Sequence, residues 1–214
     1  GALMRVLYVG FGGMRWDWVP MMWIIAILTM LVGSIIAISQ SDIKRMLAYS
    51  SIAQAGFILV GVIAASPAGL AGSMFYLIAY GFTTIGAFAI ISLVRDESGE
   101  ATNLSKWAGL GRRSPLVGGV FALFMLGLAG IPLTSGFIGK FSVFAAAIAS
   151  GDTWLVIVAV VASLIAAFFY VRVIVVMFFT EPGPQTASVV VPSAFTTIAL
   201  AAGATVTLVL GILP

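Results

Sequence analysis

The chain has 214 residues, of which 62% are hydrophobic and 8% are charged, and its formal net charge at pH 7 is +3. Soluble domains are about half apolar and about a quarter charged, so this composition excludes a water-soluble fold. The sequence has neither cysteine nor histidine, which excludes thiolate-ligated iron–sulfur clusters and removes the commonest ligands of haem and zinc. The basic residues are spread over loops between apolar runs, a pattern that indicates membrane topology rather than nucleic-acid binding.

The apolar runs predict an all-α fold, because backbone polar groups in lipid must pair within their own segment or in a closed barrel. The runs are too long for barrel strands. The first of them lacks an initiator Met and any signal-peptide pattern, so we expect one transmembrane domain, residues 1–214, that is truncated at its N-terminus. In chain order, the first predicted elements are a partial span at residues 1–11, a polar turn at 15–18, and spans at 19–39, 47–65 and 70–94.

Residues 95–115 form the one long hydrophilic segment. The apolar segment that follows, residues 116–150, is too long for one straight span at about 1.5 Å per residue. Gly130, Pro132, Gly136 and Gly139 interrupt it, so it is either two short spans or one discontinuous helix that is broken around residues 130–140. Two further spans are predicted at residues 153–179 and 194–213.

Lysine and arginine concentrate in cytoplasmic loops, which allows the two arrangements of residues 116–150 to be compared. A single broken helix places seven basic residues on the side of the 95–115 segment and leaves Arg15 on the other side. The arrangement with two short spans differs only in placing Arg172 on the opposite side of the membrane. The count therefore favours the broken helix by one residue and predicts that residues 95–115 are a cytoplasmic loop.

Lys140 is the basic residue that lies deepest within an apolar run. A charged lysine at the bilayer centre costs roughly 2.5–3.5 kcal/mol on insertion scales, and such residues commonly serve ion or proton paths. Pro132 lacks an N–H donor and the three glycines permit a helix break, so backbone carbonyls near Lys140 would be free to bind water. The alternative is that Lys140 extends to an interface from a short helix.

Several polar side chains lie on the neighbouring predicted helices and could line a hydrated route. Equally, hydroxyls in membrane helices often bond to their own backbone or join neighbouring helices. Lys44, in the polar turn with Asp42, is either a pathway residue or a topology-setting cation. The candidates on these helices are Tyr49, Ser51, Gln54, Tyr80, Thr83 and Thr84.

Three stretches together resemble one family. They are QSDIKRMLAYSSIAQAG at residues 40–56, GLGRRSP at 109–115 and GIPLTSGFIGKF at 130–141. They are similar to the antiporter-like membrane subunits of respiratory complex I, the proton-translocating NADH:quinone oxidoreductase, and within them to the subunit N group of bacteria and organelles. The resemblance runs along the whole chain and implies the second half of an inverted-repeat fold, with the first half before Gly1.

The resemblance implies that this subunit couples electron transfer on partner subunits to proton movement through a hydrated channel that contains Lys140. NADH, FMN, iron–sulfur clusters and quinone would then be bound by partner subunits, and this chain would have no redox centre or metal. Other antiporter-like subunits and lipid would surround it. The membrane would be a bacterial plasma membrane, or else an organellar inner or thylakoid membrane.

Gln54 departs from the family pattern, because many relatives have a histidine at this position. Glutamine does not titrate near neutral pH, so a proton relay at Gln54 would depend on hydrogen-bonded water. Two other functions also remain open. The chain could be a subunit of a multisubunit sodium/proton antiporter or of a membrane-bound hydrogenase, or a structural membrane subunit that transports nothing.

Overall fold

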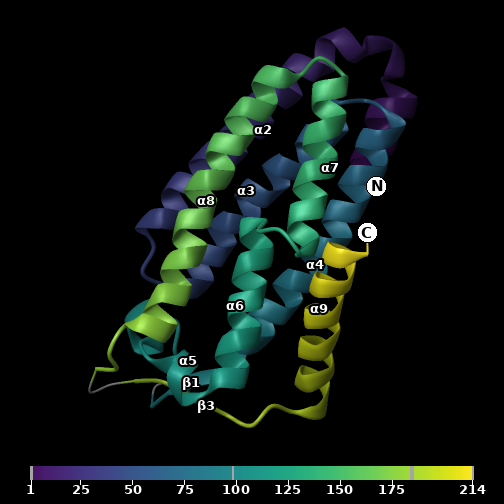
Figure 1. Ribbon diagram of the computed structural model, residues 1–214. Coiled ribbons are helices and arrows are strands. Elements are labelled where there is room, and N and C mark those ends of the chain that lie inside the picture. Colours follow the sequence, from purple (N-terminus) through teal and green to yellow (C-terminus); the bar gives the residue numbers. More distant parts are fainter. Residues whose placement is uncertain (1, 98, 184–185, 214) are drawn as a thin grey trace.

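The computed structural model describes residues 2–97, 99–183 and 186–213, and its dominant feature is a bundle of long helices (Figure 1). By length and composition, five helices in this described part are apolar enough to cross a membrane. The all-α transmembrane prediction is therefore confirmed. The long helices are α2 (Arg15–Ser39), α3 (Ile43–Ile63), α4 (Pro67–Leu93), α6 (Pro115–Ala129), α7 (Ser135–Ala149), α8 (Thr153–Phe179) and α9 (Ala194–Ile212).

The chain starts with a short helical segment that precedes α2. It comprises α1 (Ala2–Arg5), the π-helix η1 (Val6–Gly10) and the 3₁₀-helix η2 (Gly12–Met14). The predicted polar turn at residues 15–18 is wrong, because these residues form the first turn of α2. Asp17 in that turn carries a negative charge at the helix N-terminus, where the backbone dipole favours it.

Capping residues set where three of the spans begin. Asp42 accepts a hydrogen bond from the Arg45 amide at the start of α3, and Ser66 and Ser193 cap α4 and α9 in the same way. Each of these side chains satisfies one of the backbone donors that a helix N-terminus leaves unpaired. Because of these caps, α3 begins four residues before the predicted Leu47 and α4 three residues before the predicted Leu70.

The connections on one side of the bundle gather into a compact unit, here called the loop end, which comprises the described residues 40–42, 94–97, 99–114, 180–183 and 186–193. It contains β1 (Val94–Asp96), β2 (Gly99–Glu100) and β3 (Ser188–Val189), which form an antiparallel sheet in the order β2-β1-β3. Arg95 pairs with Glu100 on one side and with Ser188 on the other. The 3₁₀-helix η3 (Leu104–Trp107) and helix α5 (Leu110–Arg113) complete it. From the sequence, only a hydrophilic loop is expected here.

Residues 130–134 separate α6 from α7, and the two helices continue in the same direction with a sideways step (Figure 1). Helix α8 returns beside both of them. The broken helix is therefore present, but the break is shorter than expected: Gly136 and Gly139 lie inside α7. A Cβ on Gly136 would lie 1.9 Å from the Gly127 carbonyl oxygen, so this glycine permits close contact between α6 and α7 rather than the break.

The basic residues are distributed as the single broken helix predicts. Arg172, near the end of α8, donates to the Ile38 carbonyl at 3.0 Å, which places it close to the loop end. Arg15 lies at the other end of the bundle, where its guanidinium is 3.4 Å from the Ala64 carbonyl oxygen. Seven basic residues lie at or near the loop end: Lys44, Arg45, Arg95, Lys106, Arg112, Arg113 and Arg172.

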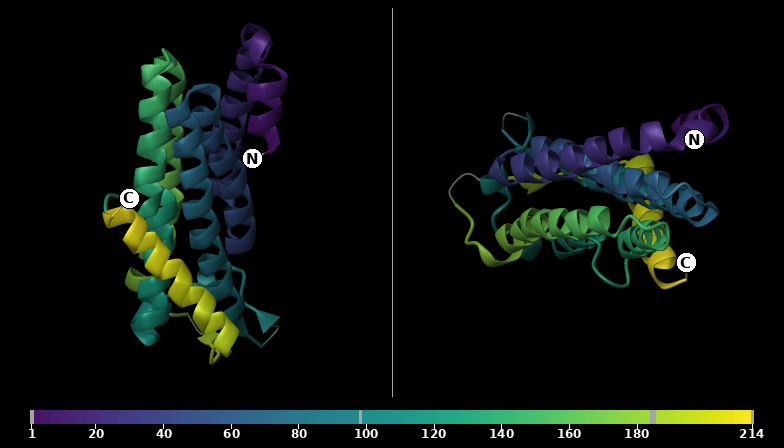
Figure 2. Two further views of the ribbon diagram at one scale, coloured as in Figure 1. Left: turned by 90° about the vertical axis from the view of Figure 1, so that its right-hand side faces the viewer. Right: turned by 90° about the horizontal axis from the view of Figure 1, so that it is seen from above.

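Two apolar clusters fill the bundle along its length. The first, near the loop end, contains Trp107, Phe121 and Phe169, and the second, towards the other end, contains Met30 and Phe57. Helix α9 crosses the bundle obliquely and ends near its middle (Figure 2). It packs on α4, where Thr83 and Thr207 hydroxyls lie 3.0 Å apart. The clusters provide the fixed frame in which the polar residues between them are held.

We predict that Gly136→Ala destabilises the protein, because the added methyl would overlap a backbone carbonyl that cannot move without displacing α6. Overpacking a close-packed interior typically costs about 1–3 kcal/mol. The measurement is thermal unfolding of the detergent-solubilised subunit. Gly119→Ala is the matched control, since a Cβ there meets no atom within 4 Å. Equal unfolding temperatures for the two variants would contradict the close contact of α6 and α7.

Candidate functional site

The end of α6 supplies unpaired backbone acceptors inside the bundle. Gly130 adopts a left-handed conformation with φ +82°, which turns the chain out of the helix. The backbone amides of Gly130 and Ile131 both donate hydrogen bonds to the Leu126 carbonyl, and the Gly130 amide also donates to the Gly127 carbonyl. The carbonyls of Leu128 and Ala129 are thereby left without helical partners, as the last carbonyls of a helix are. They require donors from elsewhere.

Lys140 on α7 provides these donors. Its Nζ donates to the Ala129 carbonyl at 2.8 Å, to the Leu128 carbonyl at 3.3 Å and to the Ser163 Oγ on α8 at 2.9 Å. The Phe57 ring centroid lies 4.8 Å from Nζ, within the range of a cation–π contact. Lys140 is only 5% exposed. Its ammonium is therefore held inside the bundle, and does not extend to either end.

The electrostatics of the break suit a cation at this position. The carbonyl end of a helix carries a partial negative charge, which stabilises a nearby positive group. The three N–H donors of the ammonium have three acceptors within hydrogen-bonding distance, so burial leaves no donor unpaired. Loss of the proton would leave the two carbonyls of Leu128 and Ala129 with fewer donors. The three acceptors around Nζ thus suit the charged form of Lys140.

The Leu128 carbonyl also connects Lys140 to Gln54 on α3. The Gln54 Nε2 donates to this carbonyl at 3.0 Å and to the Tyr170 hydroxyl at 3.2 Å. Its Oε1 accepts from the Tyr76 hydroxyl at 2.5 Å, and the Tyr170 hydroxyl is itself hydrogen-bonded to Ser50. We call this connected set the Lys140 network: Ser163, Lys140, the Leu128 carbonyl, Gln54, Tyr76, Tyr170 and Ser50.

The Lys140 network lies where the two apolar clusters meet. Leu128 and Tyr170 belong to the cluster near the loop end, whereas Phe57 and Tyr76 belong to the other. Gln54 is 1% exposed, and Ser50 is equally buried. A buried polar layer of this kind is stable only when its hydrogen-bond donors and acceptors are paired with one another. The arrangement can hold a proton and orient hydroxyl groups around it.

The other predicted residues fall into two sets. Ser51 and Tyr80 form a pair in which the Tyr80 hydroxyl donates to the Ser51 Oγ at 2.8 Å, one helical turn from Tyr76. Thr83 bonds to the Ala79 carbonyl and to Thr207, the helix-joining role that hydroxyls often have. The Thr84 hydroxyl oxygen is buried without a partner in the described part of the chain. These residues are not hydrogen-bonded to Lys140.

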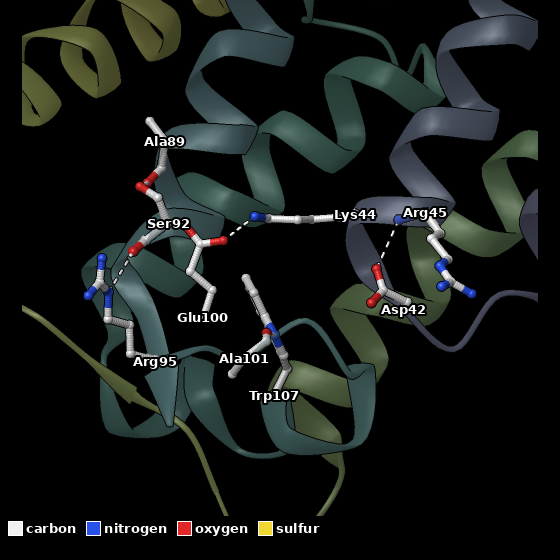
Figure 3. Close-up of polar contacts among 9 residues, drawn as sticks. All are labelled: Asp42, Lys44, Arg45, Ala89, Ser92, Arg95, Glu100, Ala101 and Trp107. Atoms are coloured by element: carbon white, nitrogen blue, oxygen red, sulfur yellow. Dashed lines mark hydrogen bonds and ion pairs between the residues drawn. The ribbon is translucent and has the colours of Figure 1, made fainter. Parts of the chain in front are cut away.

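Lys44 and Tyr49 lie on the loop-end side of the network. Lys44 forms an ion pair with Glu100 of β2 (Figure 3). It precedes Gln54 by ten residues, which corresponds to about 15 Å along a helix. Tyr49 is half-buried and packs against the loop-end cluster. Neither residue belongs to the Lys140 network, so a role in proton transfer would require water between them.

The loop end holds the start of α3 through backbone and side-chain contacts (Figure 3). The Ile43 amide donates to the Thr102 carbonyl at 2.8 Å, and the Leu104 amide to the Ser41 carbonyl at 2.8 Å. Burial opposes ionisation of Asp42, but hydrogen bonds from Thr102 and from the Arg45 and Lys44 amides, with the Arg45 charge, hold the pKa of Asp42 below its ordinary value. The Asp42 cap is thus an ionised one.

The sequence patterns do not single out four partners in this site: Tyr170, Ser163, Phe57 and the Leu128 carbonyl. Ser163 and Tyr170 are seven residues apart on α8, a spacing that places both on one helix face, and this signal could have identified them. The Leu128 carbonyl carries no sequence signal. In the described residues, no three His, Cys, Asp or Glu side chains lie close enough to hold a metal ion.

A family model described as NADH:quinone oxidoreductase/Mrp antiporter, transmembrane region, matches residues 1–166. The chain belongs to this family. It is 64% identical over 214 residues to the NADH-quinone oxidoreductase subunit N of Rhodococcus opacus, which confirms the resemblance to the subunit N group. The match covers the whole chain and 40% of that relative, so the chain spans about two fifths of the relative's length.

Solved structures of the family share the fold. A chain of respiratory complex I from Thermus thermophilus superimposes with a TM-score of 0.79 and 31% identity, over 91% of this chain and 44% of that one. A chain of the Mrp complex from Dietzia superimposes with a TM-score of 0.85 and 26% identity, over 99% of this chain and 47% of that one. The antiporter-like fold is therefore common to both kinds of complex.

We predict that Gln54→Leu destabilises the protein, because the Tyr76 and Tyr170 hydroxyls and the Leu128 carbonyl lose a buried partner. An unsatisfied buried polar group costs about 1–3 kcal/mol. The test is a double-mutant cycle of Gln54→Leu with Tyr76→Phe, followed by thermal unfolding. We expect the double variant to lose less stability than the sum of the single variants. Strict additivity would show that the two side chains do not interact.

Asp42→Ala should lower stability near neutral pH by about 0.5–2 kcal/mol, the usual effect of losing an N-cap. Since the folded-state pKa of Asp42 lies below its ordinary value of 3.8, the ionised cap stabilises the fold above pH 3.8. This contribution disappears as the pH falls through the folded-state pKa. Thermal unfolding as a function of pH measures the difference from wild type. A difference that does not narrow at low pH would rule out an ionised cap.

Proposed function

We propose that this chain is part of a proton-translocating membrane subunit of an NADH:quinone oxidoreductase, with Lys140 as a proton-loading residue. The observation that carries the proposal is the buried ammonium of Lys140, which is bound by the freed carbonyls of Leu128 and Ala129 in the break between α6 and α7. Ionisable residues at broken helices are typical of ion-transport sites in membranes. NADH oxidation, flavin, iron–sulfur clusters and quinone reduction belong to partner subunits in this proposal.

Lys140 would act by alternating between two protonation states. The ammonium is stabilised by the carbonyl end of α6, and the neutral amine by exclusion of water from the surrounding apolar clusters. A change in the charges of neighbouring antiporter-like subunits would shift this balance and release the proton. Gln54 has no ionisable group, so its role is to orient the hydroxyls of Tyr76 and Tyr170.

The basic loop end would face the cytoplasm, because Lys and Arg are enriched in cytoplasmic loops. Seven of the ten basic residues lie there. The similar proteins from Rhodococcus and Thermus are bacterial, which supports a bacterial plasma membrane as the location. Residues 94–114 would then lie at the cytoplasmic surface, and Arg15 at the other surface.

A subunit of a multisubunit sodium/proton antiporter is the second candidate. The superposition on the Mrp chain supports it, since its TM-score of 0.85 exceeds the 0.79 of the complex I chain. Sequence identity points to the first candidate, because the chain is 64% identical to a subunit N and 26% identical to the Mrp chain. A shared fold alone does not decide between two functions.

Replacement of Lys140 tests the proposal directly. We expect Lys140→Met in the full-length subunit to abolish proton pumping coupled to NADH oxidation, because Met fills the space of the lysine stem but cannot carry a proton. Pumping is measured as acidification of inverted membrane vesicles. Electron transfer from NADH to a water-soluble acceptor, together with the amount of assembled complex, shows whether the complex has formed.

Lys106→Met is the matched control, since Lys106 pairs with Asp96 at the loop end and should leave pumping intact. Normal pumping by an assembled Lys140→Met complex would refute the role of Lys140 and favour a structural subunit. Measurement of sodium efflux distinguishes the two candidate functions. If sodium efflux proceeds without NADH oxidation and stops in Lys140→Met, the antiporter assignment is correct.

A further inference from the structure

The hydrogen-bond partners of Lys140 differ in what they can do with a proton. The carbonyls of Leu128 and Ala129 accept hydrogen bonds but have no proton to pass on, so they hold the ammonium without relaying it. The Ser163 hydroxyl can accept and donate at once. Among the described residues, Ser163 is the hydroxyl that bonds directly to the Lys140 Nζ, at 2.9 Å. A proton that leaves Lys140 through a side chain therefore passes Ser163.

Ser163 also borders a cavity beside Lys140. This cavity has a volume of about 330 Å³ and lies between α7 and α8. Lys140 is buried, whereas Ser163 is only half-buried, and the outer wall includes Phe141 and Leu164, which are exposed. The full lining is Gly130, Phe137, Lys140, Phe141, Phe144, Val160, Ser163 and Leu164. The volume is large enough for several waters, since one water occupies about 30 Å³ in the liquid.

We infer that Ser163 is a proton-relay residue, which transfers a proton between Lys140 and water in the cavity between α7 and α8. This inference rests on the proposed function of Lys140 and goes beyond it, by naming the group that receives the proton. The polar side chains on the cavity wall are those of Lys140 and Ser163, so water there can bond to the Ser163 hydroxyl. The aromatic rings of Phe137 and Phe144 keep the remaining wall apolar.

The transfer balances without any other reactant. The N–H bond of the Lys140 ammonium breaks as its proton moves to the Ser163 Oγ, and the original hydroxyl proton of Ser163 moves to a water molecule. Lys140 becomes a neutral amine, Ser163 is unchanged, and the water becomes hydronium. Loading of Lys140 follows the same steps in reverse. The serine must turn its hydroxyl between transfers, which a small side chain on a half-buried helix face permits.

The first experiment compares two substitutions of equal size, Ser163→Thr and Ser163→Val, in the assembled complex. Threonine keeps the hydroxyl and valine replaces it by a methyl group. Proton transfer by a positioned group commonly contributes roughly 100-fold or more, so we expect at least about a tenfold loss of pumping rate in Ser163→Val. Ser163→Thr should stay within about twofold of wild type. Equal pumping by assembled Thr and Val variants would overturn the relay.

The second experiment measures whether water enters the cavity. Residues 1–214 contain no cysteine, so Ser163→Cys adds one thiol at the cavity wall, and the full-length subunit without this substitution gives the background labelling. Only the thiolate reacts, and it forms where water reaches the sulfur. We expect a charged, membrane-impermeant methanethiosulfonate to modify Cys at position 163 in this subunit. Ala162→Cys is the control, since Ala162 is fully buried and should not react.

The outcomes separate this inference from the proposed function. If Lys140→Met stops pumping but Ser163→Val pumps normally, Lys140 remains a proton-loading residue and the relay through Ser163 is wrong. If the charged reagent modifies Ser163→Cys no faster than Ala162→Cys, the cavity is not hydrated and the relay to water is wrong. If Lys140→Met pumps normally, the proposed function itself fails.

Discussion

The structure depends on how one buried ammonium is held. Lys140 lies between two apolar clusters, where an unpaired charge would be strongly destabilising. The break after Ala129 resolves this by presenting two helix-end carbonyls that need donors as much as the ammonium needs acceptors. Each feature compensates for the other: α6 can end inside the bundle because Lys140 is present, and Lys140 can be buried because α6 ends there.

Helix α7 packs closely against α6 and α4 near the break. Gly136 lets α7 approach the Gly127 carbonyl, and Gly139 lets it approach the Tyr76 ring. Gln54 then joins α3, α4, α6 and α8 through Tyr76, the Leu128 carbonyl and Tyr170. Lys140 is therefore connected by hydrogen bonds, through the Leu128 carbonyl and Gln54, to side chains on α3, α4 and α8.

The same scaffold occurs in a complex I chain and in an Mrp chain, whose functions differ. In this chain the fold places a buried ionisable side chain, Lys140, beside an interrupted helix. Which ion moves, and what drives it, depends on side chains around the break and on partner subunits. In this chain the groups next to Lys140 are hydroxyls, an amide and aromatic rings, and no carboxylate bonds to it in the described residues.

Sequence alone determined the membrane class, the long spans and the break, and it singled out Lys140 as a candidate site residue, because hydropathy, proline and glycine act locally along the chain. Alone it could not reveal that Gly136 and Gly139 serve packing rather than the break, or that residues 94–100 and 188–189 form a sheet, since these depend on segments far apart in sequence. Nor could it find the Leu128 carbonyl or Phe57 beside Lys140. Tertiary packing determines which hydrogen bonds form to the backbone and across helices. Every residue has a backbone carbonyl, so residue identity does not show which carbonyl binds Lys140.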